Sequence, residues 1–229
     1  MYKFFVKRIF DILFSLVVSP FILVVILIFA PIIYFTDKGP IFYNAPRIGK
    51  NGKIFKMFKL RSMYVDAPDI RYDDGFTYNG ADDPRMTKIG KFIRLHSIDE
   101  LPQMFNVLFG QMSLIGPRPD TPVSLDKYTE DEKEFLSVRP GLTGYNQVYY
   151  RNFSDDKEKI ANDIYYAKNC SFLLDLKIFF KTFVVVFGHK NVYRDSNENL
   201  THYLSESEQA KLDAFAKSKS HRVKKSLKK

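Results

Sequence analysis

Two short segments carry the residues best suited to chemistry. Residues 97–103 hold two adjacent carboxylates, Asp99 and Glu100, followed by a proline. Residues 116–119 place Arg118 between two prolines. One carboxylate can attack phosphorus, a second can hold a divalent cation, and a rigidly held guanidinium can bind phosphate oxygens. These residue types and their spacing favour phosphoryl chemistry.

The acidic segment also has a simpler interpretation. Ser97 and Glu100 have the spacing of a capping box, in which both would only cap a helix. Pro102 argues against this, because its ring would collide with the carbonyl of Ile98 if the helix began there. We expect the helix to begin at Asp99 or later, with both acids at an N-terminal end that also favours phosphate.

Several other polar positions keep two interpretations. Lys59 and Arg61 end a predicted strand, where cations meet either phosphates or solvent. Residues 140–144 form either a tight turn or a backbone site for a nucleotide. His96 is a base by type, but an isolated histidine usually has no catalytic role.

An apolar segment near the N-terminus is expected to place these residues close to a membrane. Residues 12–35 are almost wholly apolar and long enough to span about 30 Å of hydrocarbon, so an ordinary signal anchor is one interpretation. Pro20 should break or kink the helix, and the hydroxyls of Ser15 and Ser19 can satisfy carbonyls freed there. Basic residues flank both ends, whereas a spanning helix usually has a one-sided bias. We therefore favour a re-entrant helix with its break at Ser19 and Pro20.

The remaining pattern predicts a mixed domain that is mainly helical. Strands are expected at 41–43 and 54–59, joined through a turn at 49–52 whose Asn-Gly pair favours positive φ. A polar loop is expected at 66–85. Helices are expected at 101–109, 128–138, 154–169, 172–187 and 206–217, the fourth being either buried or interfacial.

Composition limits the partners. The chain of 229 residues has a formal net charge of +9, and its last 14 residues hold seven Lys or Arg and no acid. This concentration suits anionic lipid better than nucleic acid, which would require basic residues spread over the domain. The single cysteine, Cys170, excludes an internal disulfide.

Taken together, the ordered motifs resemble those of the bacterial sugar transferases, the monotopic phosphoglycosyl transferases, in their short form. The resemblance runs from Lys7 to about Val192. Its motifs are Lys7-Arg8-x-Phe10-Asp11, Ser19-Pro20, Gly39-Pro40-Ile41-Phe42, Arg47-Ile48-Gly49, Lys59-Leu60-Arg61-Ser62-Met63, Asp83-Pro84-Arg85-Met86-Thr87, Asp99-Glu100-Leu101-Pro102-Gln103, Asn106-Val107-Leu108, residues 112–119, residues 140–144 and Asp163.

The resemblance implies transfer of a sugar 1-phosphate from a UDP-sugar to polyprenyl (undecaprenyl) phosphate, with release of UMP. Asp99 matches the nucleophile that forms an aspartyl phosphosugar intermediate, and Glu100 matches the ligand of Mg²⁺, for which Mn²⁺ is an alternative. Lys59 and Asp163 are expected to pair and order the site. The expected substrate-binding residues are Lys59, Arg61, Arg85, Arg118, Arg151 and Asp163.

These expectations combine into one prediction of organisation. The fold is α+β and mainly helical: a re-entrant membrane element at 1–36, a catalytic domain at 37–193 with interfacial helices and a small β-hairpin, and a polar, then basic tail at 194–229. The expected location is the cytoplasmic face of a bacterial inner membrane. Further candidate partners are anionic lipid, downstream glycosyltransferases and a second copy of the chain. The alternatives are an inactive membrane scaffold and a phosphatase with an aspartyl nucleophile.

Overall fold

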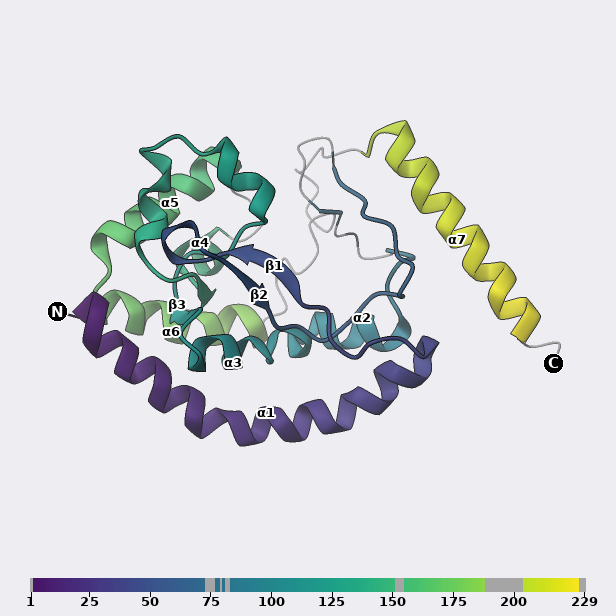
Figure 1. Cartoon of the computed structure of the whole chain (residues 1–229), viewed down its shortest axis with the longest axis horizontal. Helices are drawn as coiled ribbons and strands as arrows, with labels where there is room; N and C mark the ends of the chain where they lie inside the picture. The colour runs from purple at the N-terminus through teal and green to yellow at the C-terminus, as the bar shows by residue number, and fades with distance from the viewer. Residues whose placement is uncertain are drawn as a thin grey trace.

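The computed structural model describes residues 2–72, 77–78, 80, 83–150, 155–187 and 204–226. The described chain is mainly helical, with two small two-stranded sheets (Figure 1). The α-helices are α1 (Lys7–Asp37), α2 (Lys88–Leu95), α3 (Gln103–Leu108), α4 (Tyr145–Tyr149), α5 (Asp156–Asn169), α6 (Phe172–Phe187) and α7 (Glu206–Ser226). The strands are β1 (Ala45–Ile48), β2 (Ile54–Met57), β3 (Ser113–Ile115) and β4 (Gly141–Thr143). The predicted fold class is thus confirmed in its mainly helical character and its small hairpin.

The hairpin forms around the predicted turn. Strands β1 and β2 pair antiparallel, with Ile48 opposite Ile54. Asn51 and Gly52 both have positive φ, as the Asn-Gly pair predicts. The predicted first strand at 41–43 is wrong, because Phe42 makes only an isolated bridge to Leu60. Gly39 and Pro40 precede that segment, and the strand that pairs with β2 begins only at Ala45.

The second sheet brings together two motifs that are far apart in the sequence. Strands β3 and β4 pair parallel, and Gly141 donates its N–H to the carbonyl of Pro117 at 2.8 Å. A Cβ on Gly141 would lie 2.1 Å from the Gly116 nitrogen, so only glycine permits this approach. The arginine loop at 116–119 is therefore fixed by the turn at 140–144.

Helix α1 is one uninterrupted helix that curves around the underside of the domain (Figure 1). The predicted break at Ser19 and Pro20 is therefore wrong, although curvature agrees with a proline inside a helix. The Ser15 hydroxyl donates to the carbonyl of Asp11 and the Ser19 hydroxyl to that of Ser15, both at 2.6 Å. Such back-bonding bends a helix without ending it.

Polar contacts fix the beginning of α1 to the domain. Lys7 pairs with the carboxylate of Asp175 on α6. Arg8 donates to the carbonyls of Val107 and Leu108, at 2.5 and 2.8 Å, at the end of α3. The buried carboxylate of Asp11 accepts the Leu114 N–H at 2.9 Å. Buried polar groups at this end of α1 are therefore paired with the domain.

The other end of α1 is fixed in the same way. Asp37, its last residue, forms a two-pronged pair with Arg61, in which both N–O distances are 2.6 Å. Between these anchors Ile22 and Ile33 are buried in the core. Helix α1 is long and apolar enough to cross a membrane by length and composition alone. Its two ends are nevertheless both fixed to one domain.

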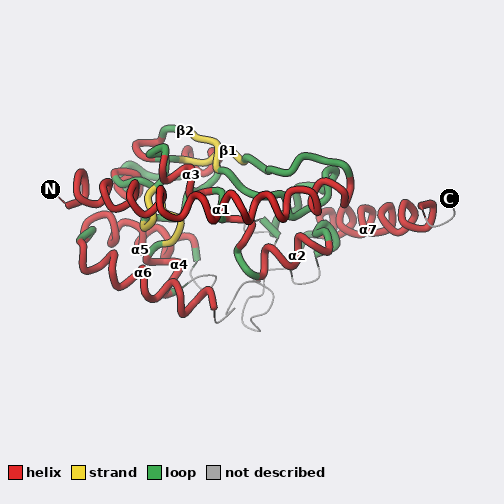
Figure 2. Tube along the Cα trace, turned by 90° about the horizontal axis from the view of Figure 1, so that it is seen from below, coloured by secondary structure: helices red, strands yellow, loops and turns green. Residues whose placement is uncertain are grey.

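The outer face of α1 continues an apolar surface. Figure 2 shows α1 crossing the underside of the molecule, with α6 and α2 beside it. Exposed apolar side chains on these helices are Leu13, Leu16, Val17, Phe21, Val24, Leu27, Ile28, Phe92, Phe172, Leu173, Phe180 and Val184. An exposed apolar patch of this extent is typical of a surface that meets lipid or another protein.

The other helix predictions differ in outcome. Helices α3, α5 and α6 confirm the helices expected at 101–109, 154–169 and 172–187. The helix expected at 128–138 is wrong, because only a 3₁₀ helix at Glu132–Ser137 forms there. The Glu132 carboxylate accepts the Thr129 N–H, and the Thr129 hydroxyl accepts the Glu132 N–H. These side-chain bonds compete with a helix at 128–131, so the 3₁₀ helix begins only at Glu132. Helix α7 is longer than the expected 206–217 and packs Leu212 against the domain.

Candidate functional site

The two adjacent acids lie on a short 3₁₀ turn, Ile98–Glu100, between α2 and α3. Ser97 adopts a left-handed conformation, with φ of 55°, and its side chain caps nothing. The capping-box interpretation is therefore wrong. The α-helix begins after Pro102, as the proline predicted. The carbonyl of Asp99 accepts the Leu60 N–H at 2.9 Å, which places the acids beside the segment that follows β2.

That segment brings Lys59 to both carboxylates. Lys59 Nζ lies 2.9 Å from Asp99 Oδ2 and 3.3 Å from Glu100 Oε1. Asp99 is buried, with 1% of its side chain exposed. Lys59 approaches Asp99 Oδ2 from a direction unsuitable for a hydrogen bond, so this oxygen has no hydrogen-bond partner among the described residues. This buried oxygen therefore has the charge of Lys59 beside it but no hydrogen bond in the described chain.

Arg118 completes the acid pair from the other side. Its Nη2 atom lies 2.8 Å from Glu100 Oε1, and 46% of its side chain is exposed. Burial alone would raise the pKa of the Glu100 carboxyl, but Arg118 and Lys59 together hold that pKa well below its usual range. Glu100 is therefore ionised at any physiological pH, between two cations of which one faces solvent.

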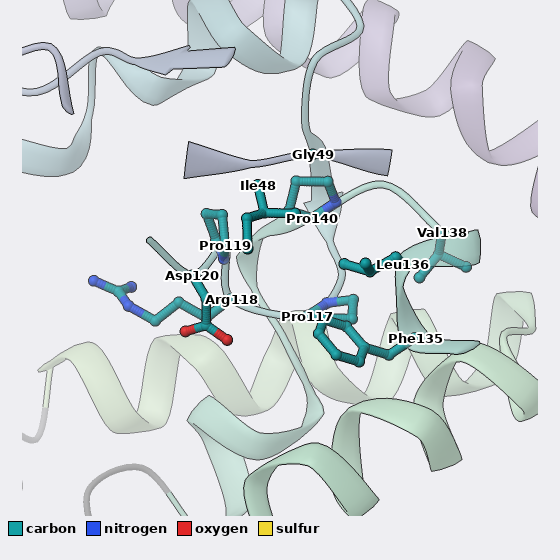
Figure 3. A pocket seen from close by; sticks show the side chains of 10 residues that line it. All are labelled: Ile48, Gly49, Pro117, Arg118, Pro119, Asp120, Phe135, Leu136, Val138 and Pro140. Carbon is teal, nitrogen blue, oxygen red and sulfur yellow. The ribbon is translucent and has the colours of Figure 1, made fainter. Parts of the chain in front are cut away.

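The arginine loop has one apolar side and one side from which Arg118 extends. Figure 3 shows a small depression lined mainly by proline and apolar side chains from β1, the loop and residues 135–140. The Arg118 guanidinium points away from this depression (Figure 3). Ile48 donates its N–H to the carbonyl of Asp120 at 2.9 Å, which ties the loop to β1. The apolar side of the loop therefore packs against the domain, while the Arg118 side chain is partly exposed to solvent.

A second charged group supports the loop. Asp120 accepts hydrogen bonds from the Tyr128 hydroxyl, at 2.6 Å, and from Lys159 on α5. Lys159 Nζ also lies 3.8 Å from Asp163. The expected pairing of Lys59 with Asp163 is thus not the one the structure has, because Lys59 faces Asp99 and Glu100. Burial raises the pKa of Asp163 to about 7, and neither of its carboxylate oxygens has a hydrogen bond in the described chain.

Two predicted substrate-binding arginines have structural partners instead. Arg61 is buried and pairs with Asp37, and its remaining donors reach the carbonyls of Pro40, Met63 and Ile33. Its guanidinium is therefore occupied in fixing the end of α1.

Arg85 is occupied in the same way within the polar loop. It is 1% exposed, pairs with Asp83 at 2.7 Å, and donates to the carbonyls of Pro68 and Tyr78. Both guanidiniums contact a carboxylate and backbone carbonyls, whereas the sequence predicted that they would contact phosphate. Arg151 lies outside the described residues.

A further cation lies on the strand that is bonded to the arginine loop. Arg47 is on β1, next to Ile48, which donates its N–H to the carbonyl of Asp120. The Nη1 atom of Arg47 donates to the carbonyl of Pro46 at 2.9 Å.

The acid pair also suits a divalent cation. The described residues contain no cluster of three His, Cys, Asp or Glu side chains. Mg²⁺ in phosphoryl-transfer sites is usually held by only one or two carboxylates, with waters and substrate phosphates as the other ligands. Asp99 Oδ2, which accepts no hydrogen bond in the described chain, and the ionised Glu100 meet that requirement.

A comparison with known proteins now identifies the family. The sequence pattern of the family described as "Bacterial sugar transferase" matches residues 2–189. The chain belongs to the bacterial sugar transferases. The matched residues include α1, the hairpin, both carboxylates, the arginine loop and α6, whereas α7 lies beyond the match.

Curated relatives agree with this assignment. The chain is 46% identical over 158 residues to the galactosyl transferase CpsE of Streptococcus agalactiae, covering 66% of this chain and 35% of the relative. It is 39% identical to the UDP-glucose:undecaprenyl-phosphate glucose-1-phosphate transferase of Klebsiella pneumoniae, covering 82% and 41%. It is 38% identical to the exopolysaccharide production protein ExoY of Sinorhizobium fredii, covering 79% and 84%. The chain thus spans less than half of the first two relatives.

Proposed function

We propose that this bacterial sugar transferase moves a sugar 1-phosphate from a UDP-sugar to polyprenyl (undecaprenyl) phosphate and releases UMP. The observation that carries the proposal is the buried Asp99 carboxylate beside Glu100, Lys59 and Arg118, on a domain that carries a large apolar helix. The Klebsiella relative is named for the same class of donor, acceptor and transferred group.

In the first step, a carboxylate oxygen of Asp99 bonds to the β-phosphorus of the donor. The bond between that phosphorus and the bridging oxygen breaks, and its electron pair leaves with UMP. In the second step, a phosphate oxygen of the lipid attacks the same phosphorus and displaces Asp99. The products are a polyprenyl diphosphate sugar and the regenerated carboxylate, so no proton or redox partner is required.

The residues of the chain stabilise the charge that moves in these steps. Lys59 and Arg118 now contact carboxylates, and we propose that they turn toward phosphate oxygens when the donor binds. Glu100 would hold Mg²⁺, which neutralises phosphate charge when bound. Because Arg118 is half exposed, it is the cation best placed to meet the donor first.

The same surface supports a membrane location. Both ends of α1 are fixed to one domain, which fits a helix that enters and leaves a bilayer on one side. The exposed apolar faces of α1 and α6 would lie at the interface, and the basic end of the chain would meet anionic lipid. We place the domain on the cytoplasmic face of a bacterial inner membrane, at the initiating step of glycan synthesis.

The test is UMP release by the purified protein with undecaprenyl phosphate, Mg²⁺ and a panel of UDP-sugars. The account predicts release with at least one donor and its loss in Asp99→Asn. Lys56→Gln is the matched control, since this exposed side chain lies on the same hairpin. Release of inorganic phosphate in place of UMP would indicate a phosphatase, and no turnover with any donor would favour an inactive scaffold.

A further inference from the structure

A basic depression lies where the first turns of α1 meet the tip of the hairpin and the segment before β4. Five cations line it: Lys3, Lys7, Arg8, Lys50 and Arg139. Within the described chain, Asp11 is the one acid in the lining, and its carboxylate already accepts from the Ser113 hydroxyl and the Leu114 N–H. Lys59 and Arg118, the cations beside the acid pair, do not line this depression. It is therefore a second positive site on the molecule.

The cations from the beginning of α1 are held in place by the domain. Lys7 pairs with Asp175, whereas Arg8 donates to two carbonyls at the end of α3. Lys3 Nζ donates to the carbonyl of Ala167 at 3.1 Å. Of these contacts, only that of Lys7 is with a carboxylate. A carbonyl orients a cation without cancelling its charge, so the depression keeps a positive potential.

Arg139 and Lys50 complete the lining from the domain. Arg139 Nε donates to the carbonyl of Gly110 at 2.9 Å, and neither Nη atom has a hydrogen bond or ion pair among the described residues. Lys50 begins the turn Lys50–Gly52 at the tip of the hairpin. Burial lowers the pKa of Lys50, and the charges of Arg139 and Lys3 lower it further. A phosphate between these groups would relieve the repulsion and accept the guanidinium donors of Arg139.

The depression borders the exposed apolar surface of α1. Phe10 and Leu13 follow Lys7 and Arg8 within two turns, and they are 52% and 56% exposed. The ring centroids of Phe10 and Phe172 lie 5.9 Å apart, so this apolar surface continues onto α6, whose beginning lies beside that of α1 (Figure 1). Basic side chains at the edge of an apolar helical surface are typical of proteins that bind anionic lipid at a membrane.

We propose that this depression binds the phosphate of an anionic glycerophospholipid, whose acyl chains lie along the exposed sides of α1 and α6. Arg139 and Lys50 contact the phosphate oxygens, and Lys3 and Arg8 add positive charge from the beginning of α1. The lipid would hold the first turns of α1 at the interface, separately from the basic end of the chain. The polyprenyl phosphate acceptor must instead reach the acid pair, which has no residue in common with the depression.

The test measures lipid binding to the full-length protein in detergent by native mass spectrometry. The probes are phosphatidylglycerol, phosphatidylcholine of the same chain length and undecaprenyl phosphate. We expect the unaltered protein to bind phosphatidylglycerol more tightly than phosphatidylcholine. Lys50→Gln combined with Arg139→Gln should weaken phosphatidylglycerol binding by about 10- to 100-fold, the usual effect of losing hydrogen bonds to a charged group, and leave the other two lipids unaffected.

The matched control combines Lys53→Gln with Lys56→Gln, which removes the same charge from exposed positions of the same hairpin. It should leave all three affinities unchanged. Equal losses of phosphatidylglycerol binding in the two double variants would show a response to overall charge and overturn the proposal. An unchanged phosphatidylglycerol affinity in the Lys50 and Arg139 variant would also overturn it. A loss confined to undecaprenyl phosphate would assign the depression to the acceptor instead.

Thermal unfolding shows whether the Lys50 and Arg139 variant is folded. Should it fail to fold, Lys50→Gln alone carries the test, because its side chain lies at the tip of the hairpin. This variant should weaken phosphatidylglycerol binding by about 5-fold, the usual effect of one charge near an anionic lipid. An unchanged affinity in Lys50→Gln would then contradict the proposal.

Discussion

At the scale of single residues, the site is a pair of acids held between cations. Lys59 is the only described cation within 4.0 Å of Asp99, and it also contacts Glu100. Replacing it by Gln removes charge while keeping a similar length. We expect Lys59→Gln to lower kcat about 10²-fold, in the range seen when one electrostatic contact to a transition state is removed.

Steady-state UMP release measures this prediction, and Lys56→Gln provides the comparison. A fall in rate for both variants would show that hairpin charge in general, and not the position of Lys59, supports activity. Unchanged kcat in Lys59→Gln would remove this residue from the reaction.

Asp163 gives a prediction on stability and pH. Its pKa in the folded protein, about 7, is raised by burial above the ordinary 3.8, so the folded state binds more protons than the unfolded state between these values. The free energy of unfolding should therefore contain a contribution from Asp163 that is complete below pH 4 and declines until about pH 7. One pKa unit corresponds to about 1.4 kcal/mol, so the total is a few kcal/mol.

Asp163→Asn cannot ionise and removes this contribution. Thermal unfolding in detergent should show that the stability difference between Asp163→Asn and the unaltered protein shifts in favour of the variant from pH 5 to pH 8. A difference that does not depend on pH would mean that Asp163 has an ordinary pKa in the folded protein.

At the scale of elements, one side chain that was expected to bind substrate fixes the end of a helix. The Arg61–Asp37 pair joins the last residue of α1 to the segment after β2, and both side chains are largely buried. Arg61→Met leaves Asp37 without its partner. We expect a loss of about 3–5 kcal/mol, the usual effect of breaking a buried pair, and an unchanged KM for the donor in the protein that remains folded.

A double-mutant cycle with Asp37→Asn tests this assignment. If the pair is structural, the second substitution should recover part of the stability lost in the first. A raised KM for the donor with unchanged unfolding temperature would instead return Arg61 to the substrate site.

The elements also show which features the sequence could predict. The structure brings together the acids, Lys59 and Arg118, each of which lies in a short motif with unusual residue types. The helix start after Pro102 follows from the proline ring. The ion pairs of Arg61 and Arg85 could not be predicted, because a guanidinium suits a carboxylate and a phosphate equally well. Their partners, Asp37 and Asp83, are chosen by tertiary packing. Pro20 was expected to break or kink α1; the helix continues through this proline and curves.

At the scale of the whole molecule, the anchored ends of α1 predict its topology. Lys3 and Lys38 flank the helix near the contacts with Asp175 and Arg61. Cysteines placed at positions 3 and 38, in a Cys170→Ser background, should react with an impermeant reagent from the same side of the membrane. Labelling from opposite sides would restore the signal anchor and require the domain contacts of one end to open.

The covalent intermediate tests the central claim most directly. The protein is incubated with its UDP-sugar and Mg²⁺ but without the lipid acceptor, and intact-protein mass spectrometry follows the product. The account predicts one UMP per active site and a mass increase equal to one sugar phosphate, located on Asp99 and absent from Asp99→Asn. UMP release that requires the lipid acceptor, with no adduct on the protein, would show direct transfer and contradict a nucleophilic role for Asp99.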